Sequence, residues 1–281
     1  MAYNVDALSA YVAENKDVIL RDIVFGGEYG DTIPLMTKEL GVKGTAKIHP
    51  TTMDAILQDA AFCGFTPQGG LNVAEVTVET FQKKVNAEFC VDSLIGKFAE
   101  YKVRVGANQD ALPFEAEIVE GLVKGINTQV EELIWEQLNA LTAPVTLAGA
   151  TAYDKVMEVY MAMDERVLED GMIFVSPAIF RAYVNELVTK NLFHYNPAEG
   201  DLNEIFIPGS GVKVRKARGI KGNYILGTSP KNLVYATDFM GNAEEVKVWY
   251  SDDADMYRVK VRFNYGAAVI FQDLAVKGTW E

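Results

Sequence analysis

The sequence has few of the residue types on which catalytic and metal sites depend. Its 281 residues include only two cysteines, Cys63 and Cys90, and two histidines, His49 and His194. Two cysteines make neither a disulfide framework nor a zinc site, so we expect reduced, structural thiols. Each histidine lies in a sequence that contains proline or asparagine, which favours a structural or surface role.

Catalytic and nucleotide-binding motifs are also absent from the sequence. It has no HExxH, GxSxG, Walker or GxGxxG pattern. The aspartates of 252–255 suggest calcium, but the glycine and glutamate that an EF-hand loop requires are missing. Aspartates also suit a hairpin turn for backbone reasons. We therefore expect no catalytic residue, no cofactor and no metal.

Long apolar runs and positive charge are scarce as well. No apolar run approaches the ~18 residues of a membrane span. The first basic residue is Lys16, so the basic start of a signal peptide is missing and we expect a protein made in a cytoplasm. The net charge of −13 repels a polyanion on average, so the chain is a poor candidate for condensing nucleic acid.

One dense basic cluster stands out against this acidic background, and its members are Lys213, Arg215, Lys216, Arg218 and Lys221. It could contact phosphate or an acidic patch on another subunit. It could equally be used in charge pairing within the chain.

The most prominent element that the sequence predicts is a helix over 110–143. Asp110 can cap its start, Pro113 fits the first turn, and Pro144 ends it. Apolar residues recur at helical spacing, at Ile118, Leu122, Ile126, Val130, Leu133, Ile134, Leu138 and Leu141. At ~1.5 Å per residue the helix would be on the order of 45 Å long. Such a rod braces a wide sheet or a repeated assembly, or else it is the buried helix of an ordinary enzyme.

The N-terminal third lacks a core of its own. An amphipathic helix is predicted over 5–24 and ends at Gly26, after which 28–47 shows little periodicity. A glycine-rich turn at 64–70 then precedes an alternating stretch, 71–90, that reads as one long strand. We expect a projecting hairpin that needs a partner surface, either on its own domain or on another chain.

The C-terminal half alternates helices and strands. Helices are predicted over 153–168 and 178–192, capped by Thr151 and Ser176, with a buried strand at 172–175 between them. Short strands follow at 205–207, 212–214, 224–226 and 233–235. A hairpin joins strands 246–250 and 256–263, Gly266 ends the second strand, and a last strand is predicted over 267–271. A short helix at 93–101 and a strand at 102–105 complete the prediction.

This order of elements resembles the major capsid protein of tailed bacteriophages, the Hong Kong 97-type shell fold. Three segments carry the resemblance: GMIFVSPAIFRAYV (171–184), NLVYATDF (232–239) and EVKVWYSDDADMYRVKVRFNYGAAVIF (245–271). The resemblance covers essentially the whole chain and implies an α+β fold.

The resemblance also implies a division of the chain. Residues 1–45 would be an N-terminal arm lying across a neighbour, and 46–92 an extended β-hairpin loop reaching over the adjacent subunit. Residues 93–144 and 244–265 would form a peripheral domain around the long spine helix. Residues 145–243 and 266–281 would form an axial α/β domain at the centre of hexamers and pentamers.

The function implied is that of a non-enzymatic subunit of an icosahedral shell that encloses phage DNA in the virion and assembles in the host bacterial cytoplasm. Its partners would be copies of itself, a portal, a separate scaffolding protein and DNA contacted without sequence specificity, with no membrane. Our candidates for subunit contacts are Phe62, Phe65, Val76, Val78, Phe81, Ile19, Ile23, Lys213, Arg215 and Arg218.

Two other interpretations remain. An encapsulin-like nanocompartment subunit has a similar fold and length but encloses enzyme cargo, and an apolar pocket for a cargo tail would favour it. A soluble α+β enzyme or binding protein would instead show a ligand-sized cleft.

Overall fold

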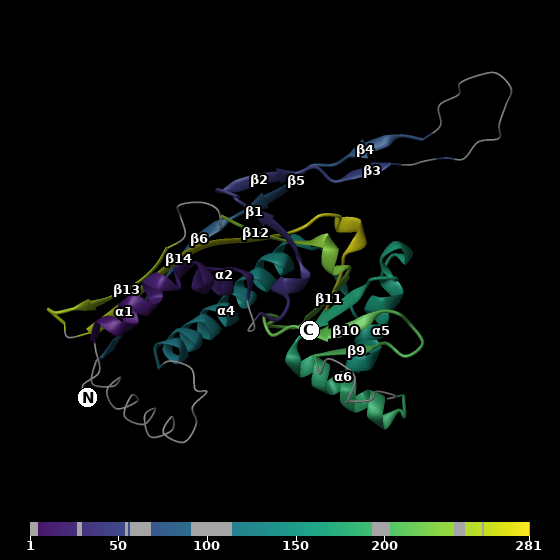
Figure 1. The fold of residues 1–281 in the computed structure, drawn as a ribbon. Coiled ribbons are helices and arrows are strands. Elements are labelled where there is room, and N and C mark those ends of the chain that lie inside the picture. The colour runs from purple at the N-terminus through teal and green to yellow at the C-terminus, as the bar shows by residue number, and fades with distance from the viewer. Residues whose placement is uncertain are drawn as a thin grey trace.

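The computed structural model describes residues 5–26, 30–53, 56, 69–90, 114–192, 203–238, 245–254 and 256–280. Its elements build two sheets, a long helix between them, and a two-stranded ribbon that extends away from both (Figure 1). The predicted elements at 93–101 and 102–105 lie outside the described residues.

The N-terminal helix predicted over 5–24 is two helices, α1 (Val5–Glu14) and α2 (Lys16–Phe25). Asn15 separates them because its backbone leaves the helical region, with φ −104° and ψ 15°. Its side-chain amide donates to the carbonyl of Tyr11 at 2.9 Å. Gly26 ends α2 in the left-handed conformation with φ 84°, which confirms the predicted cap.

The long helix is α4 (Phe114–Leu141), as predicted within the described residues. Its buried apolar residues are Val119, Val123, Ile126, Val130, Ile134, Trp135 and Leu138. The buried face is therefore rotated from the predicted stripe: Ile118, Leu122 and Leu133 are only partly buried, and Leu141 is 43% exposed. Gly121 and Gly125 lie on the exposed face.

The first sheet surrounds β14 (Met256–Val269), the longest strand that the structure describes. β13 (Glu245–Ser251) and β6 (Phe81–Cys90) pair with its first part, and β12 (Leu233–Thr237) pairs with its end, all antiparallel. β1 (Thr37–Leu40) adds to β12 in parallel. Helices α1, α2 and α4 cover one face of this sheet (Figure 1), and their apolar residues form the larger core with it.

Two sequence predictions about this sheet are wrong. β14 continues through Gly266, so residues 267–269 extend the same strand and pair with β12. We expected a break at Gly266 and a separate strand in the axial domain. β12 itself, assigned from the sequence to the axial region 145–243, lies in the first sheet because its registered partners are β1 and β14.

The second sheet has the order β7 (Pro144–Thr146), β15 (Val276–Thr279), β11 (Tyr224–Thr228), β8 (Met172–Val175), β10 (Lys213–Lys216), β9 (Glu204–Phe206). Every residue of β8 is buried, as predicted. One face of β8 packs with α5 (Ala152–Ala162) and α6 (Pro177–Thr189) in a second core. The other face reaches α4, where the ring centroids of Phe174 and Trp135 lie 5.0 Å apart.

Local signals for the two helices of this second body are confirmed. Thr151 forms a capping box with Asp154, and Ser176 caps α6 with Pro177 in the first turn. Short 3-10 helices complete the chain: Ile33–Leu35 (η1), Glu165–Val167 (η2), Pro230–Asn232 (η3) and Gln272–Leu274 (η4).

The ribbon is built from two short antiparallel pairs. β2 (Thr45–Ile48) pairs with β5 (Val76–Glu79), and β3 (Thr51–Met53) pairs with β4 (Leu71–Val73). The stretch 71–90 is therefore three strands, interrupted at 74–75 and at Thr80, where the sequence predicted one. None of the helices in the described ranges has the length and apolar content needed to cross a membrane.

The buried face of α4 can be tested with two substitutions in the same helix. Ile134 is fully buried and Leu141 is 43% exposed. We expect Ile134→Ala to lower the free energy of unfolding by about 2–5 kcal/mol, because it removes core methylenes and leaves a cavity. Leu141→Ala should change it by about 0.5 kcal/mol or less. Urea unfolding of the unassembled subunit measures both, and equal losses would contradict the assigned face.

Candidate assembly surface

The outer part of the ribbon exposes apolar side chains that its own chain does not cover. Every residue of β3 and β4 is exposed. Met53 is 72% exposed, Leu71 and Val73 are each 58% exposed, and the nearby Ile56 is 56% exposed. An isolated two-stranded ribbon is marginally stable in water. This ribbon therefore has both the surface and the physical need for a partner.

The base of the ribbon, in contrast, is fixed to the first sheet. Val78 is fully buried in a small cluster with Val42, Val234, Ala236 and Ala268. Where β5 crosses β14, a side chain at Gly266 would overlap the carbonyl oxygen of Glu79. Gln137 of α4 accepts from the amide of Ala267 at 2.9 Å and donates to the carbonyl of Glu79 at 3.4 Å. The glycine and the glutamine together set where the ribbon leaves the body.

Thr80 makes the corner between the ribbon and β6. Its amide donates to the carbonyl of Gly44 at 2.6 Å, and its hydroxyl oxygen accepts from the amide of Gly44 at 3.1 Å. Gly44 adopts φ 81°, which favours glycine. Further out, Lys47 and Glu75 pair across the ribbon at 2.6 Å, and this hydrogen bond lowers the pKa of Glu75 below its ordinary value.

The segment that joins α2 to β1 is held by one buried carboxylate of α4. Glu131, 2% exposed, accepts from the amides of Asp31 and Thr32 at 2.8 Å each and from that of Ile33 at 3.2 Å. It also accepts from the hydroxyl of Thr32, and that hydroxyl oxygen accepts from the indole N–H of Trp135 at 2.9 Å. Residues 31–33 are thereby seated on α4 without belonging to a strand.

Four residues of the basic cluster are used within the chain. Lys213 and Arg215 both pair with Glu204, at 2.5 and 3.1 Å. Arg218 pairs with Asp31 at 3.6 Å, and Lys221 with Glu132 at 2.5 Å. Of the three uses that the sequence left open, internal charge pairing is the one found for these side chains.

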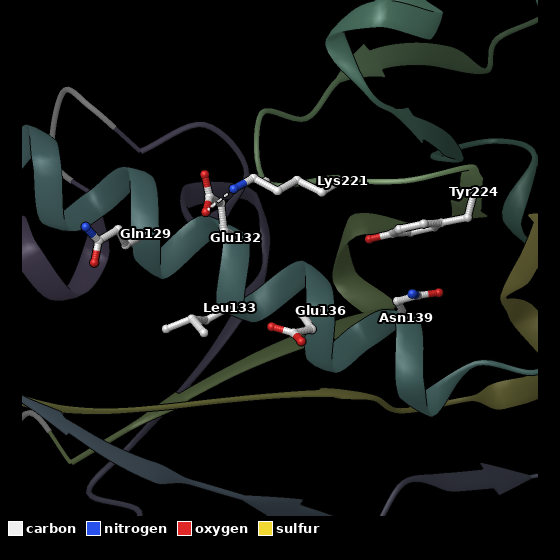
Figure 2. Close-up of a pocket in the computed structure, with 8 residues that line it drawn as sticks. Gln129, Glu132, Leu133, Glu136, Asn139, Lys221 and Tyr224 are labelled. Atoms are coloured by element: carbon white, nitrogen blue, oxygen red, sulfur yellow. Dashed lines mark ion pairs between the residues drawn. The ribbon is translucent and has the colours of Figure 1, made fainter.

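A cavity of about 650 Å³ lies between α4 and the loop before β11. Figure 2 shows Glu132 of α4 pointing toward Lys221 and Asn139 of α4 beside the Tyr224 ring. Tyr224 donates to the carbonyl of Trp135 at 3.0 Å, and its burial raises the pKa of its phenol. Glu132 forms an ion pair with Lys221. Most of the residues that line the cavity are polar, and none of them is histidine, cysteine or serine.

The structure places the predicted contact residues in three groups. Ile19, Ile23 and Val78 are buried in their own chain, so the proposal that they contact a neighbour is wrong for this conformation. The amphipathic helix α2 buries its apolar face on α4, and β1 pairs with β12 of the same chain. The predicted contact of the arm 1–45 with a neighbour stays a prediction. Val76 is partly buried, and Phe81 is 45% exposed beside Tyr265.

The remaining candidates are the basic residues and two phenylalanines. Lys213, Arg215 and Arg218 bind acids of their own chain, as described above, while Phe62 and Phe65 lie outside the described residues. Sequence reasoning missed Glu131, because a glutamate inside an amphipathic helix normally faces solvent. Among the described residues, no three or more histidine, cysteine or acidic side chains form a group that could hold a metal ion.

Among the comparisons with known proteins, only the comparison of structures finds matches. No family model matches the sequence, and no curated protein matches it. Among solved structures, the satellite phage P4 procapsid chain superposes with a TM-score of 0.62 and 9% identity, covering 97% of this chain and 95% of that one. A chain from the capsid of a native GTA particle superposes at 0.58 with 10% identity, covering 88% of each chain.

The chain has the Hong Kong 97-type capsid fold. A virus-like particle from Pyrococcus furiosus shares this fold, with a TM-score of 0.56, 10% identity and coverage of 94% of this chain and 97% of that one. The α+β class expected from the sequence is confirmed.

The base of the ribbon can be tested at Gly266. We expect Gly266→Ala to destabilise the subunit by about 1–3 kcal/mol, because the new methyl group overlaps the Glu79 carbonyl. Gly121→Ala is the matched control: an added Cβ there meets open space, so it should stabilise α4 by about 1 kcal/mol. Denaturant unfolding measures the free energy of unfolding of both variants. If Gly266→Ala leaves this free energy unchanged, β5 and β14 do not cross as closely as described.

The ion pair of the ribbon predicts a pH effect. Because the pKa of Glu75 is lowered in the fold, its stabilising contribution is complete above the ordinary glutamate pKa and is lost as pH falls through the lowered value. We expect Lys47→Ala to return the titration midpoint of the Glu75 carboxyl to its ordinary value. Carboxyl-detected NMR titration measures it, and identical midpoints in the two proteins would show that the pair does not form.

Proposed function

We propose that this chain is the structural subunit of an icosahedral capsid that encloses phage DNA. The observation that carries the proposal is the ribbon, which projects from a body of the Hong Kong 97-type fold, has a buried base, and exposes apolar side chains on its outer strands β3 and β4. A protein that acts alone gains nothing from such an extension. A subunit that must overlap its neighbours needs one.

The energetics favour assembly through many modest contacts. Burial of apolar surface is worth roughly 25 cal/mol per Å². The exposed apolar residues of β3 and β4 offer only a small contact area on one subunit. A closed shell repeats this contact at every subunit, so that every copy of the surface is buried. The same repetition stabilises the ribbon itself, which is marginal when solvated on both faces.

Within this proposal the second sheet with α5 and α6 forms the axial domain at the centre of hexamers and pentamers. Exposed apolar side chains on this body support contacts there, since Met161 is 74% exposed and Val188 and Phe206 are each 56% exposed. The ribbon, β2 to β5, forms the overlapping loop, and the first sheet with α4 forms the peripheral domain, so β6, which the sequence assigned to the loop 46–92, belongs to the peripheral domain.

A portal and a separate scaffolding protein complete the proposed set of partners. The net charge of −13 supports weak, non-specific contact between the shell and packaged DNA, because an acidic chain does not bind a polyanion tightly.

An encapsulin-like compartment is the second candidate, because the same fold also occurs in a virus-like particle from Pyrococcus furiosus, which is not described as a phage capsid. An apolar pocket for a cargo tail was the feature expected of this candidate, whereas the cavity beside α4 is lined mainly by polar side chains. A soluble enzyme has the weakest support, since the residues that line this cavity include no serine, cysteine or histidine.

The ribbon can be removed cleanly to test the proposal. Ile48 and Val76 are directly opposite in the β2–β5 pair, so an Asn-Gly turn can replace residues 49–75. We expect this subunit to keep the circular dichroism spectrum of the native chain and to form no closed shells in negative-stain microscopy.

Val18→Ser provides the matched control, because Val18 is an exposed apolar residue on α2, away from the ribbon. This variant should assemble as the unmodified chain does. Normal shells from the shortened subunit would overturn the proposed overlap.

A further inference from the structure

Asp238, the residue that follows β12, is a buried acid without a partner. It is 1% exposed, and neither of its side-chain oxygens has a hydrogen-bond partner among the residues that the structure describes. By contrast, the similarly buried Glu131 accepts from three amides and a hydroxyl. An ionised carboxylate is costly to bury unless it is paired or bound to a metal ion. Asp238 therefore needs a compensating positive group that the described residues do not supply.

Asn264 of β14 lies opposite Asp238 and has a matching deficit. The register pairs Ala236 with Gly266, so further along the two antiparallel strands Asp238 comes opposite Asn264. The hydroxyl of Thr237 donates to the carbonyl of Asn264 at 3.0 Å, which holds the two strands together beyond the last registered pair. Asn264 is 8% exposed, and its side-chain oxygen also has no hydrogen-bond partner within the described ranges.

Both side chains lie on the face of the first sheet that the base of the ribbon covers. Side chains alternate between the two faces along a strand, and Ala236 and Ala268 belong to the small cluster around Val78. Asp238 and Asn264 are an even number of residues from these alanines, so they share their face. Directly opposite residues have Cβ atoms roughly 4.5–5.5 Å apart. The two oxygens of a carboxylate and one amide oxygen are therefore buried side by side without a donor from the described residues.

The corner between the ribbon and β6 passes beside these oxygens and brings backbone carbonyl groups to the same face. The amide of Val42 donates to the carbonyl of Thr237, next to Asp238 in the chain, at 3.1 Å. The carbonyl of Val42 itself accepts from the hydroxyl of Thr80 at 3.3 Å. A carbonyl oxygen has two lone pairs, so it can accept a further contact. The surroundings of Asp238 are therefore rich in oxygen ligands.

We propose that Asp238 and Asn264 bind a hard metal cation, with Ca²⁺ as the favoured ion. Ca²⁺ takes carboxylate, amide and backbone carbonyl oxygens in flexible geometry, whereas Mg²⁺ retains several water molecules, for which a buried site leaves little room. The site needs no group of three acidic side chains, because one acid is joined by neutral oxygens. The bound ion holds the corner of the ribbon against the first sheet. This proposal does not depend on the shell function.

Titration of the unassembled, chelator-treated subunit with CaCl₂ in a calorimeter tests the site directly. We expect saturable binding with a Kd of roughly 10⁻⁴–10⁻³ M, because few charged ligands make a weak calcium site. Asp238→Asn removes the carboxylate and should weaken binding at least about tenfold. Asp252→Asn is the matched control, since it removes the same charge from an exposed turn and should leave the Kd unchanged. MgCl₂ should bind more weakly than CaCl₂.

Thermal unfolding gives a readout that loose binding of calcium to surface acids does not reproduce. Without metal, Asp238→Asn should unfold at a higher temperature than the native chain, because an uncompensated buried charge is removed. In about 10 mM CaCl₂ the native chain should gain several degrees and Asp238→Asn should gain none. Asn264→Asp supplies a variant with the opposite change: a second carboxylate should tighten calcium binding about tenfold and lower the metal-free unfolding temperature.

Amide hydrogen exchange locates the bound ion in the fold. We expect calcium to slow exchange at the amides of Val42 and Thr80 about tenfold in the native chain, because opening of the corner then requires release of the ion. The amides of α6 should be unaffected. If calcium has no effect on the native chain, or acts equally on the native chain and Asp238→Asn, the proposal is overturned and the shell function stands.

Discussion

Packing on two sides of α4 is the constraint on which the rest of the molecule depends. Its apolar residues pack in one core with β14, and Trp135 meets Phe174 of the second sheet at 5.0 Å between ring centroids. A helix held on two sides can serve as a common reference for both sheets. The base of the ribbon is tied to it through Gln137, and residues 31–33 are seated on it through Glu131. The positions of the ribbon and of residues 31–33 are therefore both set relative to α4.

Much of this architecture follows from local sequence signals. Thr151, Ser176 and Pro177 fix the starts of α5 and α6, and Gly26 fixes the end of α2, because cap chemistry acts within one turn. The apolar run of β8 is recognisable because a strand buried on both faces needs no alternation. The length of α4 is evident between its proline boundaries. These features depend on neighbours in the sequence, so the sequence suffices.

Other features depend on contacts between distant residues. The buried face of α4 is rotated because Asn127 and Glu131 face inward, where Asn127 donates to the carbonyls of Asp22 and Gly26 and Glu131 binds residues 31–33. Gly266 reads as a strand end, yet it is the point where Glu79 crosses a continuing strand. The register that sets Lys247 opposite Lys260 and Lys84 opposite Arg262 likewise arises only from the pairing of β14 with β13 and β6.

The seat of residues 31–33 bears on how a fold persists while sequences diverge. Three backbone amides and one hydroxyl converge on the Glu131 carboxylate, so the segment is positioned mainly through N–H groups that every residue type except proline possesses. Replacement of the Ile33 side chain would leave its amide contact in place, whereas loss of the carboxylate would release all four donors at once. A segment held in this way depends on one side chain, Glu131, while the side chains of residues 31–33 can change with little effect on its position. This allows the sequence to diverge while the fold is kept, as in the capsid and particle chains of the same fold that are only 9–10% identical to this one.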